Sequence, residues 1–285
     1  EGISREQEYE HLRQLQPDLP LQEMQGNFLR LRLQDYTLKW ERHSEFTRYS
    51  LVQSLPASAG LGSQEPELLS HLKLPEGWLA AIPGKTFSAI KLVMLQDELS
   101  DPQLALERAR HWMGDFPLIA SRMGQPAHSL VATDFRLRES GFERMLVLAP
   151  PGTSMSRAGR ISQRLLELET YRLMALRGLP VAKFVSSHLG RAEKVLSDII
   201  DSLEQQDSDE QALLSRLVGL AAEVERMTAA HAYRFAATAA YDKLVSERIA
   251  ELRESPISGT QTIGEFMKRR LSPAMATVAA TSKRL

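Results

Sequence analysis

The sequence predicts an α+β fold, with a mixed, largely antiparallel sheet and helices first, and a long-helix, coiled-coil-like or stalk-like C-terminal half. Residues 27–52 alternate apolar and polar side chains, which is typical of half-buried strands. Residues 213–252 repeat a seam at alternating spacings of four and three. Near Pro151 aromatic residues thin out and helix formers take over. We therefore expect an α/β head domain in residues 1–151 and a helical stalk or bundle in residues 152–285.

The head is expected to begin with an antiparallel meander of three strands. In each strand, alternate residues are suited to a core and the residues between them to water. Short turn-like segments separate the three stretches, which favours antiparallel neighbours over crossover connections. The stretches are NFLRLRL (27–33), TLKWERH (37–43) and EFTRYSLV (45–52).

The rest of the head alternates helices and strands. PEGWLAAIPG (75–84) predicts a short helix closed by Pro-Gly, and TFSAIKLVML (86–95) predicts a central strand because it is almost continuously apolar. Asp101 and Pro102 predict the start of a helix, since Asp caps helices and Pro suits their first turn. Three further strands are expected at 118–124, 129–140 and 142–150.

The second half predicts four helices. The first starts at Ser154 or Ser156 and ends near Arg177, before Gly178 and Pro180. The others are expected at about 181–205, 209–253 and 262–285. The third would be roughly 65–70 Å long at about 1.5 Å per residue, which is more than a compact domain of this size can cover. Part of it should therefore pack on another chain, or on helices of the same chain in an extended stalk.

Composition narrows the classes of function. Net charge is −1, which gives no global attraction to nucleic acid, and cysteine is absent, which excludes disulfides, thiolate catalysis and cysteine zinc sites. The sequence contains no phosphate-binding glycine loop, dinucleotide fingerprint or metal-ligand spacing. We therefore expect no cofactor, no metal and no nucleic-acid partner.

The stretch KWERHSEFTRYSL (39–51) is the first candidate site. Glu41, His43 and Glu45 could act as acid and base in a hydrolase or transferase, with Arg42 or Arg48 holding an anion. Alternatively these residues form cross-strand ion pairs on a half-exposed sheet, with Trp40 in the core. No nucleophile motif accompanies them, so we favour a charge network over catalysis.

ELETYR (167–172) is the second candidate. Arg172 falls on the apolar stripe of its helix, and a buried arginine needs a partner. Glu169 could be that partner, as could Glu41 or Glu45 of the sheet. We expect the two clusters to meet as a charge network or ligand site, with Glu167 and Tyr171 beside Arg172.

Three polar residues, His231, Arg234 and Thr238, interrupt the heptad-like seam of the longest predicted helix. Polar seam residues commonly set register and oligomeric state. We expect that role here, in a homo-oligomer formed through the long helices. The full seam is Leu213, Leu217, Leu220, Val224, Met227, His231, Arg234, Thr238, Tyr241, Val245, Arg248 and Leu252.

Three stretches together resemble a family of uncharacterised bacterial proteins, catalogued as domain of unknown function 3422. They are LKWERHSEFTRYS (38–50), GRISQRLLELETYRLMALRGLPVA (159–182), and RFAATAAYDKLVSERIAELRE (234–254) followed by EFMKRRLSPAM (265–275). The resemblance implies a longer parent protein that continues through further helix into a hydrophobic C-terminal membrane anchor. It brings no established activity.

From these observations we expect the soluble portion of a membrane-anchored bacterial protein, on the cytoplasmic side. It would be a non-enzymatic, self-associating module for scaffolding, signalling or gating. The order of an α/β head, long helices and an anchor is also similar to that of CorA-like channels, so a CorA-like soluble domain in divalent-cation transport is one alternative. The hydrolase or transferase is the other. Likeness of architecture alone does not establish either.

Overall fold

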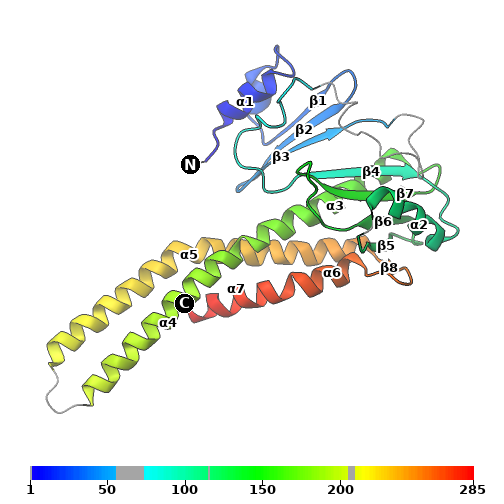
Figure 1. Ribbon diagram of the computed structural model, residues 1–285. Coiled ribbons are helices and arrows are strands. Elements are labelled where there is room, and N and C mark those ends of the chain that lie inside the picture. Colours follow the sequence, from blue (N-terminus) through cyan, green and yellow to red (C-terminus); the bar gives the residue numbers. More distant parts are fainter. Residues whose placement is uncertain (1, 56–73, 115, 205–208) are drawn as a thin grey trace. The chain divides into compact units, whose positions relative to one another are not determined.

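The computed structural model describes residues 2–55, 74–114, 116–204 and 209–285, and Figure 1 shows its helices and strands. The chain forms two compact units, residues 1–91 and 92–285. One sheet has three strands and the other has five, and the long helices follow in the C-terminal half. This is the α+β class that the sequence predicts, because strands and long helices occupy separate stretches of the chain.

The three-stranded sheet is the predicted antiparallel meander. The apolar residues of the first two strands are buried, and the residues between them are half-buried or exposed. The alternation of apolar and polar residues in the sequence therefore matches the alternation of burial in the structure; the buried residues are Leu29, Leu31, Leu38 and Trp40. The strands are β1 (Phe28–Arg32), β2 (Thr37–Arg42) and β3 (Thr47–Val52).

The buried face of this meander shares a core with two elements that precede it, α1 (Arg5–Arg13) and η1 (Leu21–Met24). Ser4 and Gln7 form a reciprocal cap at the start of α1: the Gln7 N–H donates to Ser4 Oγ (3.2 Å), and the Ser4 N–H donates to Gln7 Oε1 (2.8 Å). Neither element was expected from the sequence.

The short helix predicted at 75–84 is wrong. This stretch forms a series of turns, and Gly77 has φ +73, which lies outside the range of a right-handed helix. Trp78 is nevertheless buried in the same core as the meander, so the segment contributes its aromatic ring rather than a helical face.

The five-stranded sheet has the order β4-β7-β6-β5-β8. Its β5, β6, β7 and β8 pair antiparallel, whereas β4 and β7 end side by side, with the Asp97 N–H donating to the Ala149 carbonyl (2.9 Å), as parallel neighbours do. The sheet is therefore mixed, as predicted. Its strands are β4 (Ile90–Gln96), β5 (Ile119–Met123), β6 (Ser129–Thr133), β7 (Glu143–Ala149) and β8 (Ser255–Pro256).

Helix boundaries follow the capping signals in the sequence. The side chains of Asp101, Ser154 and Asp209 accept hydrogen bonds from the first-turn N–H groups of their helices. Pro180 lies in the first turn of its helix, where proline costs no hydrogen bond. The helices are α2 (Pro102–Met113), α3 (Met155–Leu176), α4 (Gly178–Leu203), α5 (Glu210–Leu252), α6 (Ile263–Arg270) and α7 (Ser272–Arg284).

The last predicted helix, 262–285, is two helices rather than one. α6 ends at Arg270 and α7 begins at Ser272. Pro273 explains the break, since its ring would clash with the preceding turn and it cannot donate the hydrogen bond that a continuous helix needs there.

α5 packs against α3 and α4, which run along it one after the other, and α7 lies beside them (Figure 1). Much of the seam predicted for α5 is on its packed side: Leu213, Thr238, Val245 and Leu252 are buried, whereas Leu217 is exposed by 41%. The long helix is therefore covered partly by helices of its own chain. Within the described ranges, no helix combines the length and apolar character needed to span a bilayer.

The predicted domain boundary near residue 151 lies in the second compact unit, between the end of β7 and the start of α3. It marks the place where strands give way to long helices. That residues 1–151 and 152–285 are separate domains stays a prediction.

Candidate functional site

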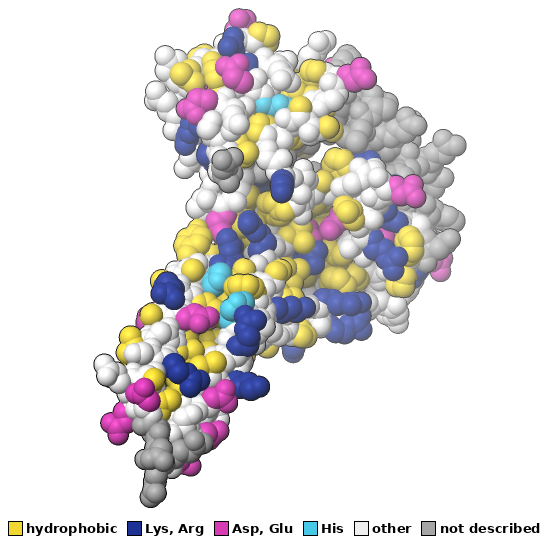
Figure 2. Space-filling model, turned by 60° about the vertical axis from the view of Figure 1, so that its left-hand side comes forward, with side chains coloured by type: hydrophobic (Ala, Val, Ile, Leu, Met, Phe, Trp, Pro, Cys, Tyr) yellow, Lys and Arg dark blue, Asp and Glu magenta, His cyan; other side chains and the backbone are white. Residues whose placement is uncertain are grey.

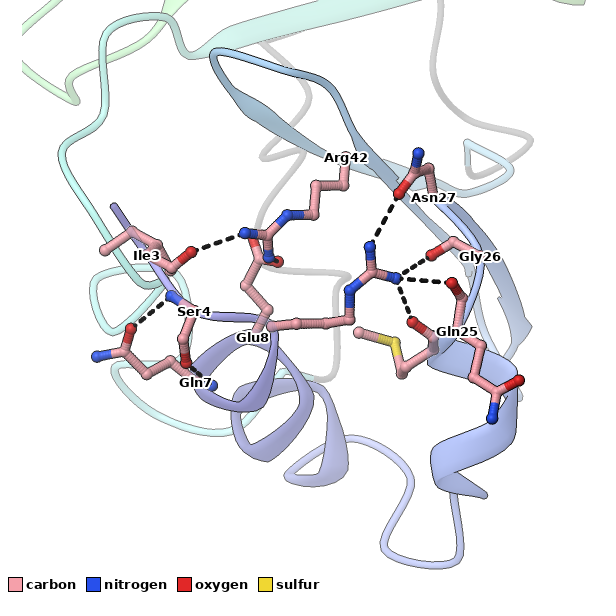
Figure 3. A network of polar contacts seen from close by, with 10 residues as sticks. Ile3, Ser4, Gln7, Glu8, Gln25, Gly26, Asn27 and Arg42 are labelled. Carbon is pink, nitrogen blue, oxygen red and sulfur yellow. Dashed lines mark hydrogen bonds and ion pairs between the residues drawn. The ribbon is translucent and has the colours of Figure 1, made fainter. Parts of the chain in front are cut away.

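The KWERHSEF stretch directs its side chains to opposite faces of the meander. Trp40 is fully buried, and Arg42, two residues later, donates to the Glu8 carboxylate and to the Ile3 carbonyl (2.8 Å). Figure 3 shows this ion pair between β2 and the first turns of α1. Because the Glu8 side chain is only 2% exposed, Arg42 compensates a charge that would otherwise be buried alone.

A second arginine holds the same end of α1. Arg5 donates to the carbonyls of Met24, Gln25 and Gly26 and to Asn27 Oδ1 (3.0 Å) (Figure 3). These carbonyls lie where η1 passes into β1, so Arg5 satisfies backbone acceptors that no strand or helix uses there. Together, Arg5 and Arg42 tie the first helix to the meander.

The other face of β2 carries a cross-strand ion pair. Glu41 lies opposite Arg48 of β3, and Arg48 Nε donates to its carboxylate (2.8 Å). β2 ends at Arg42, so His43 and Glu45 lie in the following turn, where the His43 ring stacks on Phe46 with centroids 4.3 Å apart. The arrangement is that of the charge network; acid–base chemistry by Glu41, His43 and Glu45 stays a prediction.

An aromatic cluster lies behind Trp40. The His11 ring stacks on Trp78 (4.3 Å between centroids), and Trp78 Nε1 donates to the His11 carbonyl (3.2 Å). Burial lowers the pKa of His11, which is 4% exposed, and favours its neutral form. Burial and the nearby Glu8 carboxylate raise the pKa of Tyr49, which keeps its hydroxyl protonated.

Glu8 and His11 were missed in the sequence. A signal was present in the sequence. Ser4 is followed three residues later by Gln7, which matches the capping-box pattern and predicts a helix that begins directly after Ser4. Glu8 and His11 follow three residues apart on one face of that helix, as paired contributors to a site would.

The ELETYR stretch forms a charge network in the second unit. Arg172 donates to Glu169 through both Nε (2.7 Å) and Nη2, and its Nη2 is 3.9 Å from Oε1 of Glu143 at the start of β7. Glu169 is fully buried, so the two-point contact from Arg172 is its compensation. The expectation that Glu169 would pair with Arg172 is met by this geometry.

Glu143 is the residue that sequence reasoning missed here. Burial, together with repulsion from Glu169, raises its pKa to about 7. Two carboxyl groups therefore share one arginine, and one of them holds a proton up to near neutral pH. The cluster can take up or release a proton, and the Arg172 guanidinium also lies 5.6 Å from the ring centroid of Phe135.

Glu167 points to the other side of α3. Arg248 of α5 donates to it (2.7 Å) and also to Glu251 (2.8 Å), and Gln163 donates to its second oxygen (2.8 Å). The Tyr171 ring lies 5.9 Å from that of Tyr241, also on α5. Glu167 and Tyr171 thus join α3 to α5, whereas Glu169 and Arg172 join α3 to the sheet.

The three register residues lie at different depths. Thr238 is 1% exposed and touches Gly178, where a Cβ atom would come within 2.3 Å of Thr238 Oγ1. His231 and Arg234 are half-buried, and the His231 ring lies 5.9 Å from that of Phe184 on α4. Gly178 therefore allows α5 to approach the start of α4 closely, and Thr238 marks that level.

The predicted meeting of KWERHSEF and ELETYR involves one cluster in each compact unit, and it stays a prediction. Among the residues that the structure describes, no group of three or more His, Asp and Glu side chains is placed to hold a metal ion.

Comparison with known proteins returned one match. The sequence model of a family described as "Protein of unknown function (DUF3422)" matches residues 1–285. Searches of curated proteins and of solved structures found no match.

Proposed function

Since the chain belongs to the DUF3422 family, whose description assigns no activity, we propose from the geometry that it is a non-enzymatic scaffold that docks another protein on its α4–α5 hairpin. The hairpin consists of α4 and α5 as far as they run beside each other. In the parent protein this scaffold would be held at a membrane, as the resemblance of the sequence implies.

The candidate sites support a structural role. Glu41 bonds Arg48, Arg42 bonds Glu8, and Glu169 bonds Arg172, so most of the charged groups that could do chemistry neutralise one another. Paired charges of this kind are common in networks that hold elements together. They position α1, the meander and α3.

The observation that carries the proposal is a set of exposed apolar side chains toward the closed end of the hairpin. They are exposed by 40% to 60%, where apolar residues of a long helix are normally covered. Figure 2 shows hydrophobic side chains at the surface of the helices, among acidic ones near the end of the hairpin. The set is Leu196, Ile200, Leu203, Leu214, Leu217 and Val218.

Self-association through the long helices is a separate proposal. Part of the seam that was expected to carry it is packed within the chain, with Thr238 and Val245 buried, whereas Leu217 of the same seam is exposed by 41%. A homo-oligomer would therefore need Leu217 and the exposed residues near it rather than the buried part of the seam. Light scattering on the chain gives its mass, and a strict monomer would contradict self-association.

Neither alternative function gains an observation in its favour from the described residues. A hydrolase or transferase would need charged groups that face a ligand, whereas Glu41 pairs with Arg48 and Arg42 pairs with Glu8.

The docking proposal is tested by photo-crosslinking in the native cell. A photoreactive amino acid at Ile200 should cross-link to a distinct protein, identified by mass spectrometry. The same amino acid at Arg226, an exposed position on another side of the hairpin, should give no such product. Equal cross-linking at both positions, or none at Ile200, would contradict the proposal.

A further inference from the structure

We propose that a hollow beside the turn between β5 and β6 binds a phosphate group, either as inorganic phosphate or on a small phosphorylated molecule. The hollow is lined by residues 124–127 and 253–255, and its volume of about 900 Å³ lies within the range of small-molecule sites. It is formed by the sheet and by the end of α5, so the inference does not depend on the docking function proposed for the hairpin.

Three arginines from different elements converge on this turn. Arg122 of β5 donates to the Ala127 carbonyl through Nε (3.2 Å) and Nη2 (3.0 Å). Arg157, in the first turn of α3, donates to the Gln125 carbonyl (2.9 Å). Arg253, directly after α5, donates to Oε1 of the same glutamine (2.9 Å). One turn of the chain therefore gathers three guanidinium groups.

All three arginines adjoin the hollow. Arg253 lines it, and the other two donate to carbonyl groups of residues that line it. Arg122 also lies directly opposite Ser255 of β8, another lining residue, and opposite side chains of an antiparallel pair project from the same face of the sheet. The three positive charges are therefore collected at one place on the surface of the second unit.

The bonds that hold these arginines all go to neutral amide oxygens. In the part of the chain that the structure describes, none of the three pairs with a carboxylate, whereas the arginines of the charge networks do. A guanidinium has five N–H donors, and each of these three uses one or two within the described residues. Charge and donors therefore remain for an anion.

Glu254 is the one carboxylate among the described residues of the lining, and it is already engaged. It accepts hydrogen bonds from the Ser121 hydroxyl (2.6 Å) and from the N–H groups of Ile263 (2.9 Å) and Gly264 (2.8 Å). These two N–H groups belong to the first turn of α6, whose dipole also offsets the negative charge of Glu254. The hollow therefore keeps a positive character.

Two residues of the lining hold strained backbone angles. Ala127 has φ +54 and Arg253 has φ +50, in the left-handed region that residues with a Cβ atom seldom adopt. Such residues gather at ligand sites. Arg253 follows a long helix at a position where glycine is the commonest and least strained residue. The sequence thus places a guanidinium where backbone energy alone favours glycine.

A phosphate group suits this arrangement better than a carboxylate does. It carries about 1.5–2 negative charges near pH 7, and its three free oxygens point in different directions. It can therefore accept hydrogen bonds from guanidinium groups that come from separate elements. A carboxylate is planar and carries a single charge, so the fork of one arginine satisfies it.

The first test is isothermal titration calorimetry of the chain with three probes: inorganic phosphate, glucose 6-phosphate and acetate. We expect saturable binding of at least one of the phosphate probes and at least about fivefold weaker binding of acetate. Equal binding of the two phosphate probes would assign the site to inorganic phosphate. Tighter binding of glucose 6-phosphate would assign it to a phosphorylated molecule, and both outcomes support the inference.

Variants of the chain locate the site. Arg253→Gln should weaken phosphate binding by about tenfold or more, because it removes the guanidinium that lines the hollow. Arg253→Lys keeps the charge but not the fork of donors, so its loss should be smaller. Arg226→Gln, at an exposed arginine of α5 outside the hollow, is the control and should bind as the unmodified chain does. Circular dichroism melts should show all three variants folded.

A second readout is the ionisation of His128, the last residue of the turn. Burial lowers the pKa of His128, and the charge of Arg157 lowers it further. A phosphate group among the arginines adds negative charge near the imidazole, so saturating phosphate should raise the pKa of His128. Proton NMR across a pH series measures this pKa, and a His128→Gln variant identifies the signal.

Four results would overturn the inference: no saturable binding of either phosphate probe, equally tight binding of acetate, unchanged affinity of the Arg253→Gln variant, or a pKa of His128 that does not respond to phosphate. Failure of the cross-link at Ile200 would instead overturn the docking function and leave this inference standing.

Discussion

The α4–α5 hairpin has a base, where α4 begins at Gly178, and a closed end, near Leu203 and Leu214. Both ends follow the same sequence pattern, but they differ in which elements cover them. At the base, Thr238 packs on Gly178 and Leu189 is buried near the end of α7. At the closed end, Leu203, two heptads after Leu189, is exposed by 54%. A heptad pattern therefore identifies the side of a helix that seeks a partner, but whether a partner is present depends on the neighbouring elements.

Charges differ in the same way. Helix α3 carries buried carboxylates in ion pairs, Glu169 with Arg172 of the same helix and Glu167 with Arg248 of α5, whereas the acidic residues near the closed end of the hairpin are exposed. Buried pairs hold α3 to its neighbours because neither charge can be left alone. Exposed charges contribute little to stability and remain available to attract another molecule.

The largest effect is expected from Arg172→Met. Removing this arginine leaves Glu169 buried without its compensating charge, beside Glu143, so the free energy of unfolding should fall by about 3–5 kcal/mol. Arg226→Met, at an exposed position of α5, is the control and should stay within about 0.5 kcal/mol. Urea titration followed by circular dichroism measures both. Unchanged stability of the Arg172 variant would show that the network does not hold α3.

The next two variants, Leu189→Ala and Leu203→Ala, compare how much a buried leucine at the base and an exposed leucine at the closed end of the hairpin contribute to stability. Leu189→Ala should lower the free energy of unfolding by about 2–5 kcal/mol, since it empties a packed position next to α7. Leu203→Ala, two heptads along the same side of α4, should change it by no more than about 0.5 kcal/mol. Similar losses for both would mean that the closed end is covered in solution.

A smaller effect is expected where α5 approaches the start of α4. Gly178→Ala places a methyl group within 2.3 Å of Thr238 Oγ1, so the helices must shift, at a cost of about 1–3 kcal/mol. Gly190→Ala is the matched control in the same helix; apart from the neighbouring backbone of its own helix, no described atom lies within 4 Å of its added Cβ. There alanine should stabilise by up to about 1 kcal/mol through its helix propensity. Thermal unfolding of both variants measures the contrast.

A fourth effect should appear only as a dependence on pH. The pKa of Glu143 is raised from 4.5 to about 7, so between these values the native state keeps a proton that the unfolded state has released. The free energy of unfolding therefore receives a contribution from Glu143 that is complete below about pH 4.5 and is lost as the pH rises toward 7.

Glu143→Gln removes this dependence. Relative to the unmodified chain, the variant should gain stability between pH 5 and pH 8, as measured by urea titration at both values. Glu223→Gln, an exposed carboxylate of α5, should show the same difference from the unmodified chain at both pH values. A Glu143 variant that behaves in the same way would contradict the raised pKa.

Much of the fold follows from local patterns. The alternation of residues 27–52 predicts the meander, and the caps Asp101, Ser154 and Asp209 predict helix starts to within a residue. These signals act over a few residues, which is why they can be read without the structure. The errors lie where a single backbone angle decides, as at Gly77, or where proline breaks a regular pattern, as at Pro273.

The candidate sites were predictable in kind but not in pairing. The sequence shows that Arg172 falls on an apolar stripe and must be compensated, and that Glu169 is within reach on the same helix. It does not show that Glu143 joins them from β7, because that contact depends on how α3 crosses the sheet. The contact between Glu8 and Arg42, which are far apart in the chain, likewise depends on how two elements pack, here α1 and the meander.

Sequence alone therefore specifies the class of the fold, most of the strands and long helices, and the family. Packing specifies which faces are covered: α3 and α4 take up the seam of α5, and α7 covers α4 as far as Arg284. The physical reason is range. Capping, alternation and helical periodicity act between near neighbours in the chain, whereas burial depends on elements far apart in sequence.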